Sequence, residues 1–140
     1  MKILVAADGS PYTKRMLAYL TAHDEWLGAS HSYTVLTVVM ALPPRAVAQV
    51  DKEAVKAYYG DEAEKVLKPI RSFFGRQGIE ARYVSKVGHA AELIAQLAEA
   101  GKFDLLLMGS HGQGSLTNLV MGSVATMVMA ACKTPLLLVR

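Results

Sequence analysis

Cysteine, long apolar runs and clustered charge are all scarce in this sequence, and each shortage excludes a class of protein. The single cysteine, Cys132, excludes an intramolecular disulfide and a metal site built from several cysteines. No apolar run reaches the roughly 18 residues that span a bilayer. The apolar run near Met1 is too short for a signal peptide. We therefore expect a cytoplasmic protein with no membrane partner.

Charged residues are also few, because Asp, Glu, Lys and Arg make up only 19% of the chain. The 15 basic and 12 acidic residues give a net charge of +3. They form no basic run interleaved with aromatic residues of the kind that tracks nucleic acid, so we expect no nucleic-acid partner. Hydrophobic residues make up 52% of the chain, which excludes intrinsic disorder. This apolar surplus predicts either a sheet buried on both faces or a subunit interface.

Five stretches of the chain predict β-strands. They cover residues 3–7, 33–40, 79–87, 103–108 and 135–139. Three of them read as continuously apolar, as in parallel strands that are buried on both faces. The stretch 79–87 instead alternates apolar and polar residues in its first half, which is typical of an edge strand with one exposed face.

Helical periodicity fills the intervals between these strands. The predicted helices cover residues 11–27, about 50–74, 89–100 and 123–131. Ser10 is the expected N-cap of the first helix, and Pro11 takes its first helical position. Gly60 and Pro69 lie inside the second, which predicts a kink or a division into two shorter helices.

Strands that alternate with helices predict an α/β fold, because each connection is long enough for a right-handed crossover. We expect a single domain over residues 1–140 with a Rossmann-like architecture, an open five-stranded parallel sheet with helices on both faces. In such a sheet, ligands bind at the carboxyl ends of the strands, beside the point where the strand order reverses.

Two loops at those strand ends carry the chemistry of a candidate site. Asp8 opens the first loop, and Gly109 opens a glycine-rich second loop that leads to Gly122 and Ser123. Glycines let a ligand approach the backbone, successive amides form an anion-binding nest, and the N-terminus of the following helix favours a phosphate. The alternative is an ordinary surface loop, in which Ser123 caps the helix and Asp8 caps its own turn.

Several common motifs are absent from the second loop. There is no G-x-x-x-x-G-K-[S/T] P-loop, and the glycines lack the dinucleotide-binding spacing. Ser110 is not part of a G-x-S-x-G nucleophile elbow. We do not expect Ser110 and His111 to face each other as nucleophile and base, because they are adjacent on a loop. His111 is instead the histidine placed to donate to a phosphate or a ribose.

The glycine spacing and the two ends of the chain carry a family resemblance. Gly109-x-x-Gly112, nine residues and Gly122-Ser123 resemble the G-2X-G-9X-G-(S/T) signature of the ATP-binding branch of the universal stress protein family. Residues 3–10 are similar to that family's first strand and turn, and residues 134–140 are similar to its last strand. The resemblance spans the whole chain in order.

This resemblance implies a sheet of order 3-2-1-4-5, which brings the two loops into one site. It implies ATP as the ligand, with AMP or ADP as alternatives, and Mg²⁺ on the phosphates near Asp8. The residues implied in nucleotide binding are Ala6, Ala7, Asp8, Val38, Met108, Gly109, His111, Gly112, Gly122, Ser123 and Val124. Ala6, Ala7 and Val38 would border the adenine, Asp8 would lie near the ribose or the metal, and the residues from Gly109 onward would hold ribose and phosphates.

Two features depart from the family pattern. Many relatives carry a basic residue in the nine-residue segment, where this chain has Thr117 and Asn118. Phosphate binding would then rest on backbone amides and the helix dipole. The predicted helix 123–131 carries no charge, whereas the family's last helix is usually amphipathic. A helix that is apolar on all sides is normally buried, which predicts packing against a partner.

The sequence thus predicts a nucleotide-binding regulatory protein of the stress response that acts as a homodimer. The expected dimer interface is the last strand, which consists of Pro135, Leu136, Leu137, Leu138 and Val139. Its outer edge needs to be covered, and the family commonly pairs it with the same strand of a second subunit. Two alternatives stay open: a slow ATP-hydrolysing or adenylyl-transferring enzyme of the nucleotide α-hydrolase type, and a nucleotide-free interaction module.

Overall fold

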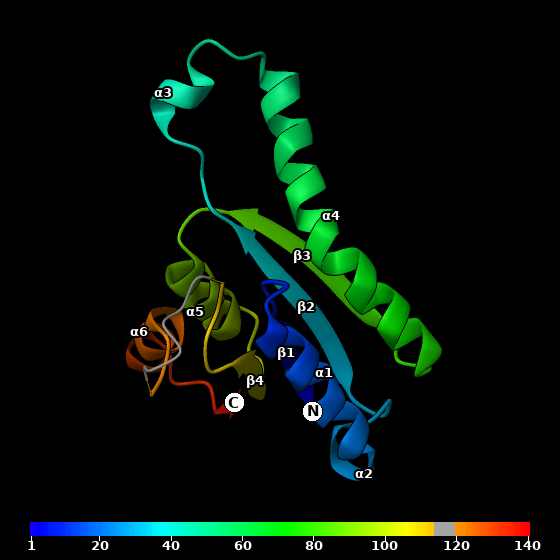
Figure 1. Ribbon diagram of the computed structural model, residues 1–140. Coiled ribbons are helices and arrows are strands. Elements are labelled where there is room, and N and C mark those ends of the chain that lie inside the picture. Colours follow the sequence, from blue (N-terminus) through cyan, green and yellow to red (C-terminus); the bar gives the residue numbers. More distant parts are fainter. Residues whose placement is uncertain (114–119) are drawn as a thin grey trace.

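The computed structural model describes residues 1–113 and 120–140, which contain an open parallel β-sheet (Figure 1). Its strands are β1 (Lys2–Ala6), β2 (Ser32–Val39), β3 (Ala81–Val87), β4 (Leu105–Gly109) and β5 (Leu136–Val139). Their order is β3-β2-β1-β4-β5, which confirms the α/β class and the strand order expected from the sequence. The expected position of the third strand at an edge of the sheet is also confirmed.

β1 lies at the centre of the sheet and pairs in parallel with both β2 and β4. Its last residue, Ala6, lies opposite Leu36 of β2 and Met108 of β4. On the outer side of β4, Gly109 lies opposite Val139 of β5. The loops that follow β1 and β4 therefore leave the sheet side by side, at the point where the strand order reverses.

Helices cover both faces of this sheet. α1 (Pro11–Ala22) and α4 (Lys52–Arg76) pack on one face, and α5 (Ala90–Ala100) and α6 (Ser123–Ala131) pack on the other. The side chains of β1 alternate between two cores, so that Ile3 and Val5 meet α1 and α4 while Leu4 and Ala6 meet α5 and α6. A strand buried on both sides needs apolar residues throughout, which explains the continuous apolar pattern of β1.

The helix predicted over residues 11–27 is interrupted. α1 ends at Ala22, and a separate short helix, α2 (Asp24–Leu27), follows it. The residue between them, His23, has φ −125° and ψ 42°, which lies outside the helical region. Two acidic residues in the first turn of α2 favour a new helix start there, because negative charge stabilises a helix N-terminus.

Of the two outcomes predicted for the second long helix, a kink or a division, the division is wrong, because α4 is one helix of 25 residues. Figure 1 shows it as a single ribbon whose axis bends along its length. Pro69 removes an intrahelical hydrogen bond, at a cost of about 3 kcal/mol. Leu67, Ile70 and Phe74 are buried around it, and each such side chain contributes about 1.5–3 kcal/mol when it leaves water. Packing against the sheet therefore outweighs the local cost of the proline.

The amino-terminal part of α4 extends past the carboxyl ends of the strands (Figure 1). No residue from 52 to 62 is buried, and the buried side of the helix begins at Ala63. A short helix that the sequence did not predict, α3 (Pro44–Val47), precedes it. The backbone N–H of Leu42 donates to the hydroxyl of Tyr59 at 2.9 Å, which ties the connection from β2 to α4. We call residues 41–62 the overhang.

α6 and β5 form an apolar surface at the edge of the sheet opposite β3. Met127 and Met129 of α6 are 54% and 52% exposed, and β5 is an edge strand whose leucines are only partly buried. Ala125 and Val128 bury the opposite side of α6 against the core. The sequence predicted that this uncharged helix is buried. In the structure one side of it is buried and the other side is exposed. None of the described helices is both long and apolar enough to cross a bilayer.

Candidate functional site

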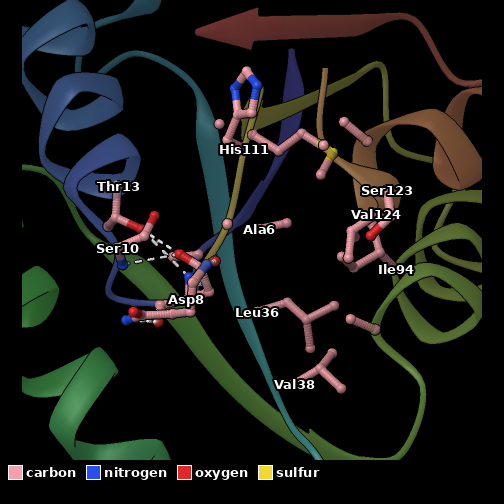
Figure 2. Close-up of a pocket in the computed structure, with 18 of the residues that line it drawn as sticks. Ala6, Asp8, Ser10, Thr13, Leu36, Val38, Ile94, His111, Ser123 and Val124 are labelled. Atoms are coloured by element: carbon pink, nitrogen blue, oxygen red, sulfur yellow. Dashed lines mark hydrogen bonds between the residues drawn. The ribbon is translucent and has the colours of Figure 1, made fainter. Parts of the chain in front are cut away.

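A cavity of about 330 Å³ lies at the carboxyl ends of β1, β2 and β4 and is closed by α5 and α6 (Figure 2). All eleven residues assigned to a nucleotide site from the sequence line this one cavity, namely Ala6, Ala7, Asp8, Val38, Met108, Gly109, His111, Gly112, Gly122, Ser123 and Val124. The strand order brings them together, because it places the loops after β1 and β4 next to each other.

One part of the cavity wall is apolar. Ala6 comes from β1, Leu36 and Val38 from β2, Ile94 from α5 and Val124 from α6 (Figure 2). These side chains lie between the sheet and the two helices on its α5–α6 face. Apolar walls with a few polar groups at one end are the usual form of a small-molecule site. This part of the cavity suits a flat, largely apolar group.

Asp8 joins the loop after β1 to the loop after β4. Its Oδ1 accepts hydrogen bonds from the backbone N–H of Ser10 at 2.9 Å and from the hydroxyl of Thr13 at 3.2 Å. Its Oδ2 accepts from the backbone N–H of Gln113 at 3.1 Å, and the Gln113 side-chain amide donates to the Asp8 carbonyl at 3.3 Å. We call these two contacts between the loops the Asp8–Gln113 clasp. Asp8 therefore caps its own turn, as one alternative predicted, and also holds the second loop.

Gly112 passes so close to this carboxylate that a side chain there would displace it. A Cβ atom added at Gly112 would lie 2.6 Å from Oδ2 of Asp8, which accepts from Gln113. At Gly109, an added Cβ would lie 2.7 Å from the Cβ of Tyr12, an atom fixed by α1. Glycine is therefore required at Gly109, and at Gly112 it keeps the Asp8 carboxylate in its hydrogen bonds. The two glycines thus have a structural reason, close packing of the loops against each other and against α1, that is independent of any ligand.

His111 lies at another side of the cavity (Figure 2), and its ring contacts two neighbours. Its Nδ1 lies 2.8 Å from Oγ of Ser110, and its ring centroid lies 5.0 Å from that of Tyr12. The two adjacent residues therefore contact each other, although nothing in this contact makes them a nucleophile and a base. Ser110 is only 2% exposed and is not among the lining residues, so its hydroxyl is placed to orient His111 and not to attack a ligand.

α6 begins at the cavity. Gly122 is its N-cap, so the alternative in which Ser123 caps this helix is wrong. Ser123 is the first helical residue, is exposed and lies on the cavity wall (Figure 2). The first backbone amides of a helix have no partner within it and carry partial positive charge. This end of the cavity therefore has the chemistry to bind an anion without a charged side chain.

Asp8 is the one carboxylate among the described lining residues, so these side chains would not hold a magnesium ion without the phosphates of a ligand. Within the described part of the chain, no three His, Cys, Asp or Glu side chains lie together as a metal site. Three of the roughly four lone-pair positions of the Asp8 carboxylate already accept hydrogen bonds from Ser10, Thr13 and Gln113. The function proposed below therefore does not depend on a metal held by Asp8.

Sequence reasoning missed part of the cavity wall. The missed residues are Ser10, Thr13, Leu36, Met40, Ala90, Ile94, Gln113 and Ala125. Leu36 was within reach of prediction, because it lies opposite Ala6 at the ends of adjacent strands. Gln113 gave no local signal, because its contact with Asp8 joins residues 105 positions apart. Thr117 and Asn118, where many relatives carry a basic residue, fall in residues 114–119, outside the described residues.

A second cavity of about 380 Å³ lies beside the Asp8–Gln113 clasp and is lined partly by α4. The clasp borders both cavities. Lys65 and Glu62 line the second cavity from α4, and Nζ of Lys65 lies 2.7 Å from Oε1 of Glu62. The cation of the second cavity is therefore paired with a carboxylate on its own helix.

The chain resembles known proteins along its whole length. It is 33% identical over 142 residues to "Universal stress protein in QAH/OAS sulfhydrylase 3'region" of Thermus aquaticus, and the match covers 99% of this chain and 97% of that protein. Among solved structures, that of the protein MJ0577, a universal stress protein of Methanocaldococcus jannaschii, superposes with a TM-score of 0.82 at 26% identity and covers 99% of this chain and 94% of that one.

Two solved structures of the same fold contain nucleotides. A universal stress protein family protein from Arabidopsis thaliana was solved with AMP bound, and it superposes with a TM-score of 0.71 at 16% identity, covering 99% of this chain and 90% of that one. A universal stress protein in complex with cAMP superposes with a TM-score of 0.65 at 20% identity, covering 100% and 96%. The sequence of this chain also matches the Universal stress protein family as a whole over residues 1–140. The chain belongs to the universal stress protein family.

Proposed function

We propose that this protein is a nucleotide-binding regulatory protein of the stress response, which acts in the cytoplasm as a homodimer. Its ligand is an adenine nucleotide that occupies the cavity at the carboxyl ends of β1, β2 and β4. The glycine signature of the ATP-binding branch suggests ATP, with AMP and ADP as alternatives. The observation that carries this proposal is the convergence of all eleven sequence-assigned residues on one cavity wall.

The cavity wall has a part suited to each portion of such a ligand. The apolar slot between Val38 and Ile94 suits the adenine ring. Asp8 Oδ2 keeps acceptor capacity beyond its bond to Gln113, which suits a ribose hydroxyl. The α6 N-terminus and His111 suit the phosphate. The AMP and cAMP complexes of proteins with this fold support the same class of ligand.

The proposed dimer forms through β5. Within the described part of the chain this strand has no partner on its outer edge, and Leu136, Leu137 and Leu138 are only partly buried. Met127 and Met129 extend the apolar surface onto α6, each more than half exposed. Unpaired edges and exposed apolar patches are normally covered in stable proteins. A second copy of the chain, pairing β5 with β5, would cover this surface.

The test of ligand binding starts from the purified protein. After denaturation, chromatography of the released small molecules should identify an adenine nucleotide, and calorimetry should show binding of added ATP, ADP or AMP. Gly112→Val should lose this binding, because the new side chain meets Oδ2 of Asp8 and breaks the clasp. Gly60→Val is the matched control, because an added Cβ at Gly60 has no atom within 4 Å.

The outcomes of this test separate the three functions considered. Nucleotide release from the wild-type protein and from Gly60→Val, but not from Gly112→Val, supports the proposal. Rapid multiple turnover of ATP would favour the enzymatic alternative. If no nucleotide co-purifies and none of the added nucleotides binds, the proposal is wrong and the nucleotide-free interaction module is favoured.

A further inference from the structure

The cavity contains almost no charge. Among the lining residues that lie in 1–113 and 120–140, only Asp8 and His111 have ionisable side chains. No lysine or arginine is among the lining residues that the structure describes. The acidic group on this wall is therefore the carboxylate of Asp8, which is negatively charged like a phosphate.

The sequence extends this observation to the whole segment that carries the glycine loop and α6. Residues 105–131 contain no Lys, Arg, Asp or Glu, and His111 is the only residue among them that can become cationic. The part of the loop outside the described residues thus brings no cation of its own. Neutralisation of bound phosphates has to come from outside this segment or from backbone dipoles.

Cations on neighbouring elements lie outside the described cavity wall, including Lys86 of β3, which pairs in register with Val38. The guanidinium of Arg15 lies over the ring of Tyr12 at 4.8 Å, on α1, and Arg15 is not among the lining residues. Lys65 belongs to the second cavity, where it is paired with Glu62 at 2.7 Å. Neither side chain lines the cavity in which the apolar slot and the α6 N-terminus lie.

The N-terminus of α6 and His111 can balance only a small part of the negative charge of bound phosphates. A helix N-terminus is equivalent to roughly half an elementary charge. One phosphomonoester carries about −1.5 to −2 at neutral pH, and a cyclic monophosphate carries less. Each further phosphate adds negative charge to a cavity that holds the Asp8 carboxylate and no lysine or arginine among its described lining residues.

We propose that the site selects its nucleotide by charge and takes adenosine ligands with a single phosphate, AMP or cyclic AMP, in preference to ADP and ATP. This inference rests on the proposed function and specifies its ligand. The glycine signature and the charge of the site then determine different properties of the ligand. The glycines shape the loop for a nucleotide, and the missing cations limit the number of phosphates.

The experiment compares the affinities of adenosine, AMP, cyclic AMP, ADP and ATP for the wild-type protein by calorimetry, with and without Mg²⁺. We expect AMP or cyclic AMP to bind most tightly and each further phosphate to weaken binding by roughly tenfold without Mg²⁺, about 1.4 kcal/mol per step. ATP binding that equals or exceeds AMP binding would overturn the inference and leave the proposed function intact. Absence of binding by every nucleotide would overturn both.

A charge introduced into the wall provides the second arm. Gln113→Lys places a cation on the cavity wall and keeps the backbone N–H that donates to Asp8. It should strengthen ATP binding more than AMP binding, by roughly tenfold in the ratio of the two dissociation constants. Val50→Lys adds the same charge at a 47% exposed position of the overhang and should leave this ratio unchanged. Equal ratios in all three proteins would contradict selection by charge.

Discussion

Oγ of Ser110 lies 2.8 Å from Nδ1 of His111, so the buried serine orients the histidine that lines the cavity. The backbone of Ser110 is fixed as well, because its N–H donates to the carbonyl of Val139 and its carbonyl accepts from the N–H of Gly122, both at 2.8 Å. The end of β5, the start of α6 and the ring of His111 are thus held by one residue.

Ser110→Ala should therefore weaken nucleotide binding without unfolding the protein. The Ser110 hydroxyl can donate to Nδ1 or accept from it, and in either case the bond fixes the orientation of the ring. Loss of this bond should weaken AMP binding by about two- to tenfold, and nitrogen NMR of the histidine should show a changed ratio of tautomers. Ser85→Ala on the exposed side of β3 is the control. An unchanged ratio of tautomers and an unchanged affinity in Ser110→Ala would contradict this role.

Two hydroxyls beside Asp8 should respond to removal in different ways. Thr13 Oγ1 accepts from the backbone N–H groups of Asp8 and Gly9 and donates to the Asp8 carboxylate. Ser10 Oγ is buried and has no hydrogen-bond partner among the described residues. Thr13→Val should lower the free energy of unfolding by about 1–3 kcal/mol, whereas Ser10→Ala should leave it unchanged or raise it. Urea unfolding of the two variants tests the contrast, and equal losses would contradict it.

Two glycines should differ in the sign of their response to alanine. Gly60 lies on the exposed side of α4, and an added Cβ meets no atom within 4 Å. Gly60→Ala should stabilise the protein by about 0.5–1 kcal/mol, because alanine loses less entropy in a helix. Gly88 has φ +147°, and an added Cβ would lie 3.0 Å from Cδ1 of Leu93. Gly88→Ala should destabilise by about 1 kcal/mol or more. Thermal unfolding measures both changes.

Stability should fall at alkaline pH because of Tyr33. The hydroxyl of this 2% exposed residue donates to the carbonyls of Leu27 and Gly28, and burial raises its pKa to about 12. The unfolded chain releases this proton near pH 10 and the folded chain only near pH 12, so the unfolded state binds fewer protons between these values. The free energy of unfolding should therefore fall by roughly 2–3 kcal/mol across that interval.

Tyr33→Phe isolates this contribution. The variant should be less stable at neutral pH, because two carbonyls lose their donor, and its stability should fall less steeply above pH 10. Burial also raises the pKa of Tyr83, so part of the alkaline slope should persist. Tyr58→Phe, at a 42% exposed position of the overhang, is the control. An alkaline slope that is identical in Tyr33→Phe and the wild-type protein would refute the assignment to Tyr33.

The proposed dimer predicts that charge on the exposed side of α6 lowers the association constant. The double variant Met127→Lys/Met129→Lys changes two side chains that are 54% and 52% exposed, so the fold should be retained. Sedimentation velocity should show a shift toward monomer. Val50→Lys/Tyr58→Lys adds the same charge on the overhang, away from β5, and should not shift the equilibrium. A monomeric wild-type protein would rule out the dimer.

The sequence predicted the features that depend on local pattern. The continuous apolar residues of β1 and β4 and the alternation in β3 gave the strands, and the edge position of β3 followed from its alternating residues. The eleven residues of the expected site lie at strand ends or in the two loops, so knowledge of the strand order sufficed to bring them together. The strand order itself came from the family resemblance.

The features that were not predicted depend on tertiary packing, which a local sequence pattern does not reveal. Pro69 favours a break, but the buried residues on both sides of it hold α4 together. The break at His23 follows from its backbone conformation, to which the apolar periodicity of residues 11–27 gives no clue. The Asp8–Gln113 clasp and the hydrogen bond between Ser110 and His111 depend on how the two loops lie against each other. Spacing along the chain predicted neither contact.

The overhang has a consequence for motion in this protein. Residues 52–62 of α4 hold no buried side chain, whereas buried residues follow from Ala63 to Phe74. The first part is therefore held mainly by its own helix and by the bond of Leu42 to Tyr59, and we expect it to open as a local unit, while the second part opens only when the core on its face of the sheet opens. Backbone amides of the first part should exchange with solvent deuterium much faster than those after Ala63. Because Glu62 stands at this boundary and lines the second cavity, fraying of the helix would repeatedly remake one wall of that cavity.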